Sequence, residues 1–327
     1  MDGDQIYSSS NYSTSLDNRF DLPFAGIASF MKARICPDLA ALQAGEADAC
    51  IIGFPYDLGA SAKSGARQAP RAVRDASTVY ADGLRGLYDP VAGRCFLDKG
   101  QRIVDCGDID VSPCGYGQAF ANLESAVRRV LDAGAVPFVI GGDHATPIPI
   151  FRALDRFPGL CIVQIDAHLD WTDSYGEFRE SHSSPMRRAS ELPWAGSMIQ
   201  FGLRGLGSSG PEAFREAKEW GSVLISALEL RRNLEAALDR IPDAPYYYIT
   251  LDIDGLDPSI CPGTGSPQPG GMLYEEARAI IERTCQKGPL VGFDVCEVCP
   301  PCDLNGQTSL YAAQLMLDAL CFALDRE

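Results

Sequence analysis

Two of the three histidines in this chain lie beside aspartates, directly after apolar runs. His144 closes the motif GGDH, and His168 is the centre of DAHLD. A further acidic pair, Asp252 and Asp254, belongs to the motif DIDGLD. Imidazole nitrogens and carboxylate oxygens are common ligands of divalent cations, so these residues together predict a metal site. The predicted ligands are His144, Asp166, His168, Asp170, Asp252 and Asp254.

Charge balance sets the expected number of ions. Four clustered carboxylates without cations would repel one another, and some would have to take up protons. One divalent ion would leave two negative charges and two ions would leave none, so we expect two. The set is too acidic for a structural zinc site; it suits Mn²⁺ best, with Ni²⁺ or Co²⁺ as alternatives. A hydroxide between two ions is a nucleophile near neutral pH, which indicates a hydrolase.

The three motifs follow predicted buried strands at 136–140, 161–165 and 246–251. Strands that alternate with helical patterns predict one α/β domain, a three-layer α/β/α arrangement with a mostly parallel sheet of about eight strands. Ligands of such sheets bind beyond the carboxyl ends of the strands. If the strand before Asp166 continues extended, the acidic and imidazole side chains at 166–170 share one face. The other predicted strands are 49–53, 101–104, 198–201, 223–225 and 289–293, and the predicted helices are 119–133, 211–220, 227–240, 273–286 and 310–324.

Composition excludes several kinds of partner. The net charge is −16 and the chain has no cluster of Lys and Arg, so nucleic acid is not expected. No apolar run reaches the length of a membrane span, and no signal peptide is evident, which predicts a cytoplasmic protein. In a chain of this kind the twelve cysteines are expected to be reduced thiols. We expect residues 1–47 to be a leader that packs on the domain or at an oligomer interface, and residues 48–327 to be one catalytic domain.

The motifs resemble the signature blocks of the ureohydrolase family, which includes arginase, agmatinase and guanidinobutyrase. The blocks are GGDH, DAHLD and DIDGLDPSICPGTGSPQPGG, supported by GASAKSGARQAPRAVR at 59–74 and FDVCEVCPP at 293–301. The similarity covers roughly 48–325 and is closest to the agmatinase branch. It implies the arginase/deacetylase-like fold and a homo-oligomer, a trimer or a hexamer.

The resemblance also implies a role for each ligand, with two of the aspartates bridging the ions. The first ion would be held by His144, Asp166, Asp170 and Asp252, and the second by Asp166, His168, Asp252 and Asp254. The bridging pair would therefore be Asp166 and Asp252, and Asp166 counts among the expected catalytic residues.

Two further residues match the family's substrate pocket. His182 in SHSSPMRRA matches the histidine that passes a proton to the leaving amine, and Glu297 matches the acid that binds the guanidinium. A carboxylate pairs well with a planar guanidinium, and a nearby histidine can supply the proton that an amine needs to leave. The resemblance implies that the bridging hydroxide attacks the guanidinium carbon and yields urea and an amine. Agmatine, guanidinobutyrate, guanidinopropionate, guanidine and substituted guanidines all remain open as substrates.

The chain departs from the family pattern at two places. Ser183 stands where agmatinase relatives usually have Gly; it either reshapes the substrate pocket or is neutral. Cys296, Cys299 and Cys302 surround Glu297, but the chain offers no second CxxC pair for a zinc site. Buried thiols are the favoured interpretation, and a redox effect on the pocket is the alternative.

Two other functions compete with guanidino hydrolysis. One is a metal-dependent deacetylase, because deacetylases share the ureohydrolase fold. The other is a catalytically silent subunit that supports an active homologue. The two-metal ligand set and the third signature block argue against the deacetylase. The retention of all six ligands, together with His182 and Glu297, argues against the silent subunit.

Overall fold

The structure is a computed structural model that describes residues 22–36, 38–112 and 115–325. In these ranges nine strands form one sheet in the order β1-β5-β2-β6-β11-β10-β7-β8-β9, and all of its pairings are parallel. The strands are β1 (Arg34–Ile35), β2 (Ala49–Gly53), β5 (Ile103–Asp108), β6 (Val136–Ile140), β7 (Leu160–Ile165), β8 (Ala195–Leu203), β9 (Val223–Ser226), β10 (Tyr247–Asp252) and β11 (Leu290–Cys296). A separate antiparallel pair joins β3 (Leu87–Asp89) to β4 (Arg94–Phe96).

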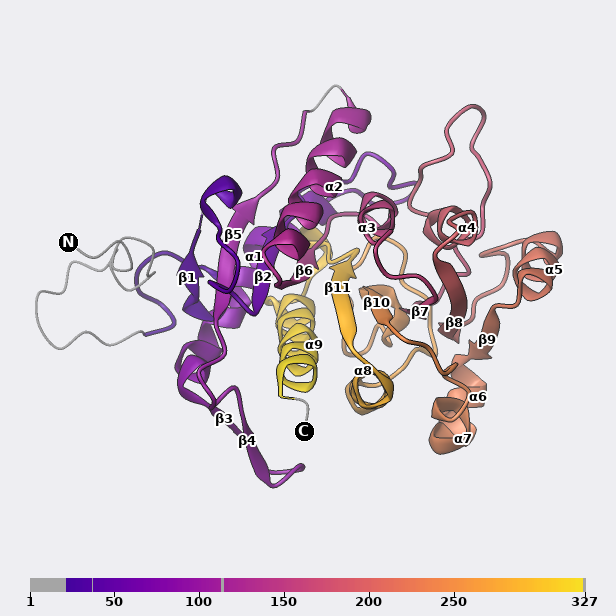
Figure 1. The fold of residues 1–327 in the computed structure, drawn as a ribbon. Coiled ribbons are helices and arrows are strands. Elements are labelled where there is room, and N and C mark those ends of the chain that lie inside the picture. Colours follow the sequence, from indigo (N-terminus) through magenta and orange to yellow (C-terminus); the bar gives the residue numbers. More distant parts are fainter. Residues whose placement is uncertain (1–21, 37, 113–114, 326–327) are drawn as a thin grey trace, which may run out of the picture.

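Helices cover both faces of the sheet, which confirms the predicted three layers (Figure 1). One layer holds α2 (Tyr116–Asp132), α3 (Pro147–Ala153), α4 (Pro185–Ser190) and α5 (Pro211–Trp220). The other holds α1 (Ala69–Ser77), α6 (Ala227–Arg232), α7 (Leu234–Leu238), α8 (Tyr274–Lys287) and α9 (Gln307–Leu324). None of the helices in the described ranges is long and apolar enough to cross a membrane.

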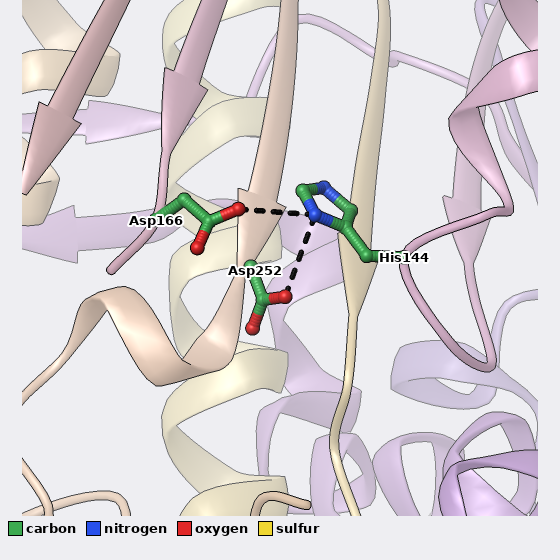
Figure 2. Close-up of side chains that lie close together, drawn as sticks. All are labelled: His144, Asp166 and Asp252. Carbon is green, nitrogen blue, oxygen red and sulfur yellow. Dashed lines mark ion pairs between the residues drawn. The ribbon is translucent and has the colours of Figure 1, made fainter. Parts of the chain in front are cut away.

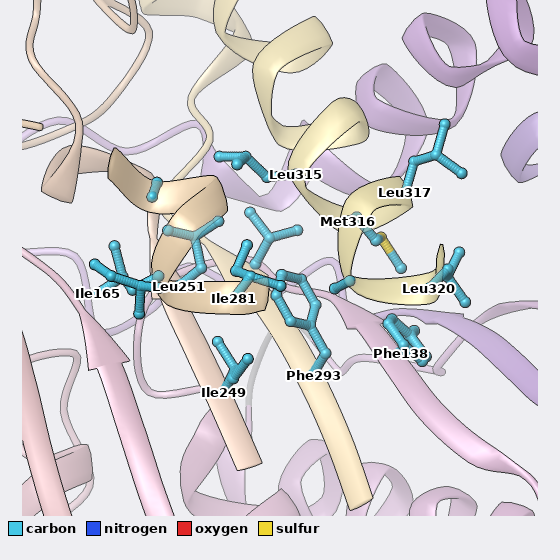
Figure 3. Close-up of a cluster of buried hydrophobic side chains, with 14 of the residues drawn as sticks. Phe138, Ile165, Ile249, Leu251, Ile281, Phe293, Leu315, Met316, Leu317 and Leu320 are labelled. Atoms are coloured by element: carbon cyan, nitrogen blue, oxygen red, sulfur yellow. The ribbon is translucent and has the colours of Figure 1, made fainter. Parts of the chain in front are cut away.

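Successive strand residues bury their side chains in two different cores. Phe138, Ile249 and Phe293 belong to the core that the sheet shares with α8 and α9, together with Ile281 and Leu320 (Figure 3). Tyr248, which precedes Ile249 on β10, belongs to the core on the opposite face of the sheet, with residues of α2 and α3. A strand that is buried on both faces needs apolar residues at nearly every position, which explains the continuous apolar runs in the sequence. Burying each large side chain contributes about 1.5–3 kcal/mol to this arrangement.

Several element boundaries differ from the predicted ones. β5 runs from Ile103 to Asp108, whereas the predicted strand was 101–104. Its acidic residues Asp105 and Asp108 form ion pairs with Arg74, which offset the cost of placing charged groups in the strand. The predicted helix at 227–240 is two helices, α6 and α7, that separate at Asn233. The Asn233 side chain accepts a hydrogen bond from the amide of Ala236 and so begins a new helix.

The segment before residue 48 contributes to the sheet. β1 is only two residues long and was not predicted; it pairs with β5 at the sheet edge. Phe30 is fully buried, and its amide donates to the carboxylate of Asp105. The residues that make these contacts precede the predicted domain boundary at residue 47. The division into a leader and a catalytic domain stays a prediction.

Candidate metal centre and active site

Neighbouring strands deliver the predicted ligands to one edge of the sheet. β6 leads to His144, β7 to Asp166, and β10 ends at Asp252, which is followed by Asp254 in the short 3-10 helix η7 (Ile253–Gly255). Since β6, β11, β10 and β7 are consecutive in the sheet, these strand ends meet. The predicted extended run after Asp166 was wrong, because β7 ends at Ile165 and Asp170 has a positive φ of 53°. A folded loop, rather than a shared strand face, brings this motif together.

His144 lies among three carboxylates. Its Nδ1 atom is 2.7 Å from Asp170 Oδ2, 3.1 Å from Asp166 Oδ2 and 3.4 Å from Asp252 Oδ2. Figure 2 shows Asp166 and Asp252 pointing at this nitrogen from two different strand ends. All four side chains are buried. One imidazole nitrogen and several carboxylate oxygens thus converge on one point.

A second cluster lies on the other side of Asp166. His168 Nδ1 is 3.1 Å from Asp254 Oδ2 and 3.5 Å from Asp166 Oδ1. Ligand atoms of His144, Asp166 and Asp252 all lie within 4.8 Å of one another, and so do those of Asp166, His168 and Asp254. Asp166 therefore belongs to two candidate ion sites and turns a different oxygen to each histidine. This geometry suits a bridging carboxylate.

The electrostatics of the metal-ligand cluster favours the binding of cations. Burial and the neighbouring carboxylates Asp254 and Asp166 raise the pKa of Asp252 well above its usual range. Burial and Asp166 likewise raise the pKa of Asp170 to about 7. For His168, burial lowers the pKa, but the hydrogen bonds and charges of Asp166 and Asp254 outweigh it and raise the pKa to about 12. The cluster thus binds protons that divalent ions would replace, and its oxygen and nitrogen donors fit two such ions.

A polar network behind His144 holds the ring and was not predicted. Its Nε2 atom lies 2.9 Å from Thr250 Oγ1, and that hydroxyl donates to Asp294 Oδ1 over 2.9 Å. The hydroxyl of Tyr248 donates to the other oxygen of Asp294 over 2.6 Å. Because Thr250 takes up Nε2, the ring presents Nδ1 to the carboxylates, as a metal ligand requires.

A second unpredicted network holds Asp166. Gln164 Nε2 donates to Asp166 Oδ2 over 2.6 Å, and Gln200 donates to Gln164 in turn. Gln164, Thr250 and Asp294 occupy paired positions on β7, β10 and β11. The sequence did carry a signal for all of them, since each is a polar residue inside an otherwise apolar strand.

His182 and Glu297 lie together beside the metal-ligand cluster. His182 Nδ1 is 3.5 Å from Glu297 Oε1, and the same oxygen accepts a hydrogen bond of 3.0 Å from the amide of His144. Glu297 is buried and has a φ of 61°, an uncommon conformation for a residue other than glycine. Burial lowers the pKa of His182, but Glu297 outweighs it and holds that pKa above its usual value. His182 Nε2 contacts Ser61 Oγ at 2.9 Å, a partner that was not predicted.

The loop that carries Ser61 is fastened to the GGDH motif. Buried Asp143 accepts hydrogen bonds from the amides of Gly59, at 2.7 Å, and Ala145, at 3.0 Å. The sequence pattern alone predicts no role for Asp143 beyond its place in GGDH. Its carboxylate fixes the start of the loop and so places Ser61 against His182.

Ser183 lies next to His182 but makes only long side-chain contacts. Its hydroxyl is 3.5 Å from the hydroxyl of Tyr175, and its carbonyl accepts from the amide of Thr172 over 2.9 Å. Ser183 is not among the residues with positive φ, so its backbone does not require glycine.

The three cysteines around Glu297 are not one cluster. Cys296 is fully buried and its thiol donates to Asp294, behind the metal-ligand cluster. Cys299 is buried elsewhere, with its sulfur 3.4 Å from that of Cys302, and Cys302 is partly exposed. Buried thiols are thus confirmed for two of the three.

The three-layer α/β/α fold and a carboxylate- and histidine-lined candidate site for two metal ions together define the class of protein. The model of the arginase family matches residues 47–321, and the chain belongs to that family. The chain is 38% identical to a guanidinopropionase of Pseudomonas aeruginosa, covering 91% of this chain and 92% of that protein. It is 34% identical to a guanidinobutyrase of the same organism, covering 91% and 92%. A hypothetical agmatinase from Burkholderia thailandensis superposes with a TM-score of 0.79 at 28% identity, covering 95% and 94%.

Proposed function

We propose that this protein hydrolyses a linear guanidino compound to urea and an amine. The observation that carries the proposal is the juxtaposition of two candidate ion sites, which share Asp166, with the His182–Glu297 pair. The names of the relatives support it, since two of them act on short guanidino acids. They favour guanidino hydrolysis over the deacetylase hypothesis and over a silent subunit.

We assign two divalent ions to the site. The first would be held by His144, Asp166, Asp170 and Asp252, and the second by Asp166, His168, Asp252 and Asp254. Asp170 lies outside the two groups of mutually close atoms, but it is the nearest carboxylate to His144 Nδ1. Such ions supply a strong nucleophile from water at neutral pH. The mixed oxygen and nitrogen donors favour Mn²⁺, with Ni²⁺ or Co²⁺ as alternatives.

The protein's own residues bind the substrate and move the proton. Glu297 presents a buried carboxylate that would pair with the cationic guanidinium and hold its carbon near the ions. His182 lies within reach of the same region and would give a proton to the departing amine nitrogen. Ser61 would orient the His182 ring through Nε2. Ser183 borders this pocket, beside Tyr175, and would contact the far end of the substrate.

We also propose a cytoplasmic homo-oligomer, a trimer or hexamer. All eleven cysteines in the described ranges are free thiols, which suits a reducing compartment. Light scattering on the purified protein measures the assembly directly, and a monomeric mass would contradict it.

A urea-release screen tests the function. The purified protein is loaded with Mn²⁺ or Ni²⁺ and supplied with agmatine, 4-guanidinobutyrate, 3-guanidinopropionate, guanidine and a substituted guanidine. We expect urea and the matching amine in equal amounts from at least one compound. Absence of urea from the whole panel, with both metals bound, would contradict the proposal.

A further inference from the structure

We infer that Cys299 and Cys302 form a redox-active dithiol whose oxidation to a disulfide lowers the activity of the neighbouring site. The two cysteines enclose two prolines, and the 3-10 helix η8 (Pro300–Cys302) turns the chain back on itself. The amide of Cys302 donates to the carbonyl of Cys299 over 2.8 Å, which fixes this turn. The two sulfurs face each other at 3.4 Å. A disulfide needs about 2.05 Å, so small side-chain rotations would close the bond.

The two thiols differ in access, and this difference sets the order of the reaction. Cys302 is partly exposed, whereas Cys299 is fully buried. Burial, with the neighbouring Cys302 thiol, raises the pKa of Cys299 to about 12. An external oxidant therefore meets Cys302 first, and Cys299 is the resolving thiol.

The oxidant class is a small-molecule disulfide such as oxidised glutathione. The Cys302 thiolate attacks one sulfur of that disulfide, forms a mixed disulfide and releases one small thiol. Cys299 then loses its proton and attacks Cys302 Sγ, which forms the internal bond and releases the second small thiol. Two protein thiols are oxidised and one external disulfide is reduced, so atoms and electrons balance.

The dithiol is coupled to the site through the loop that carries Ser61. Cys299 Sγ lies 3.6 Å from the carbonyl oxygen of Ser64. It also packs against Gly65 so closely that a Cβ atom there would lie 2.8 Å from the sulfur. The same loop carries Ser61, four residues before Gly65, and Ser61 contacts His182. Cys299 is also linked to the site along the chain, because Glu297 precedes it by two residues.

Disulfide formation would draw the Cys299 sulfur away from Ser64 and Gly65 and toward Cys302. Both the loop and the segment after Glu297 would then shift. Catalytic geometry tolerates little displacement, so we expect activity to fall on the order of tenfold. The sulfur of Cys299 contacts Ser64 and Cys302 rather than a predicted metal ligand, so we expect the metal content to stay unchanged.

The test uses the full-length, metal-loaded protein, first reduced with a phosphine and then incubated with oxidised glutathione. Peptide mapping by mass spectrometry should find the Cys299–Cys302 bond, together with an activity loss that the phosphine reverses and an unchanged metal content. Cys302→Ser should abolish both effects, and Cys299→Ala should stop at a mixed disulfide on Cys302. The matched control is Cys95→Ser, which removes an exposed cysteine in β4 and should respond like wild type.

Two results would overturn the inference. One is wild-type protein that never forms the internal bond while exposed Cys95 reacts. The other is full activity in protein that carries the bond. The effect on activity rests on the proposed guanidino hydrolysis, whereas bond formation does not. Protein that forms the bond but releases no urea even when reduced would therefore overturn the proposed function and leave the dithiol established.

Discussion

At the scale of single residues, the site separates groups that hold ions from groups that handle the substrate. The nearest partners of the His182 ring are Ser61 and Glu297, and neither residue belongs to the two candidate ion sites. Replacing it should therefore affect proton transfer and leave the ions in place.

His182→Ala should lower kcat by about 10²- to 10⁴-fold, the usual contribution of a general acid. Metal content, measured by elemental analysis, should stay near that of the wild type. A variant that keeps full turnover would refute the proton-transfer role, and one that loses its metals would make His182 part of the ion site.

Glu297→Gln preserves shape and removes the charge. Since hydrogen bonds to charged groups contribute about 1.5–3 kcal/mol, we expect kcat/KM for the guanidino substrate to fall by about 10- to 100-fold. The amide of His144 can still donate to the Gln oxygen, so the fold should persist. Steady-state kinetics and circular dichroism check both statements; an unchanged kcat/KM would exclude guanidinium binding by Glu297.

At the scale of strands and loops, close backbone approaches position Asp166. Gly202 on β8 has a φ of 99°, and a Cβ atom there would lie 2.7 Å from the carbonyl oxygen of Asp166. The loop after β7 can therefore pack against β8 only if this position lacks a side chain.

Gly202→Ala should lower the free energy of unfolding by about 1–3 kcal/mol, through overpacking and backbone strain, and should weaken activity as well. Denaturant unfolding measures the first effect. The control is Gly117→Ala in α2, where nothing lies within 4 Å, and which should be neutral or stabilising by up to about 1 kcal/mol. Equal effects of the two changes would argue against the close-approach explanation.

Sequence patterns predicted the bounds of elements that have a continuous apolar run or a clear helical period. β2 and β6 have the predicted bounds, and so does α5. The two-residue β1 was missed because so short a strand has no period to detect. α3, with the sequence PIPIFRA, was missed because its two prolines resemble a loop.

The site was predictable where residue types are rare, and less so where contacts are long-range. Three histidines in the whole chain made His144 and His168 conspicuous. Ser61 was not predictable as a partner of His182, because 121 positions separate them and serine has many ordinary roles. Thr250 and Asp294 could have been suspected as polar residues in buried strands, but their contact with each other depends on strand order.

At the scale of the whole molecule, metal binding should be linked to proton release. In the metal-free protein the pKa of His168 is raised to about 12 and that of Asp170 to about 7, so both hold protons at or below neutral pH. Ions bind the deprotonated forms, so binding should release protons and the affinity should weaken as pH falls. Titration of metal-free protein with Mn²⁺ in weakly buffered indicator solution measures the release. Proton uptake, or no change, would contradict this linkage.

The most direct test of the central claim joins metal stoichiometry to product. Metal-free protein is titrated with Mn²⁺ while urea release from the best guanidino substrate is recorded. We expect no activity without metal and a maximum when two ions are bound per chain, as the two candidate ion sites that share Asp166 require. Full activity in the metal-free protein, or a maximum at one ion per chain, would contradict a binuclear guanidino hydrolase.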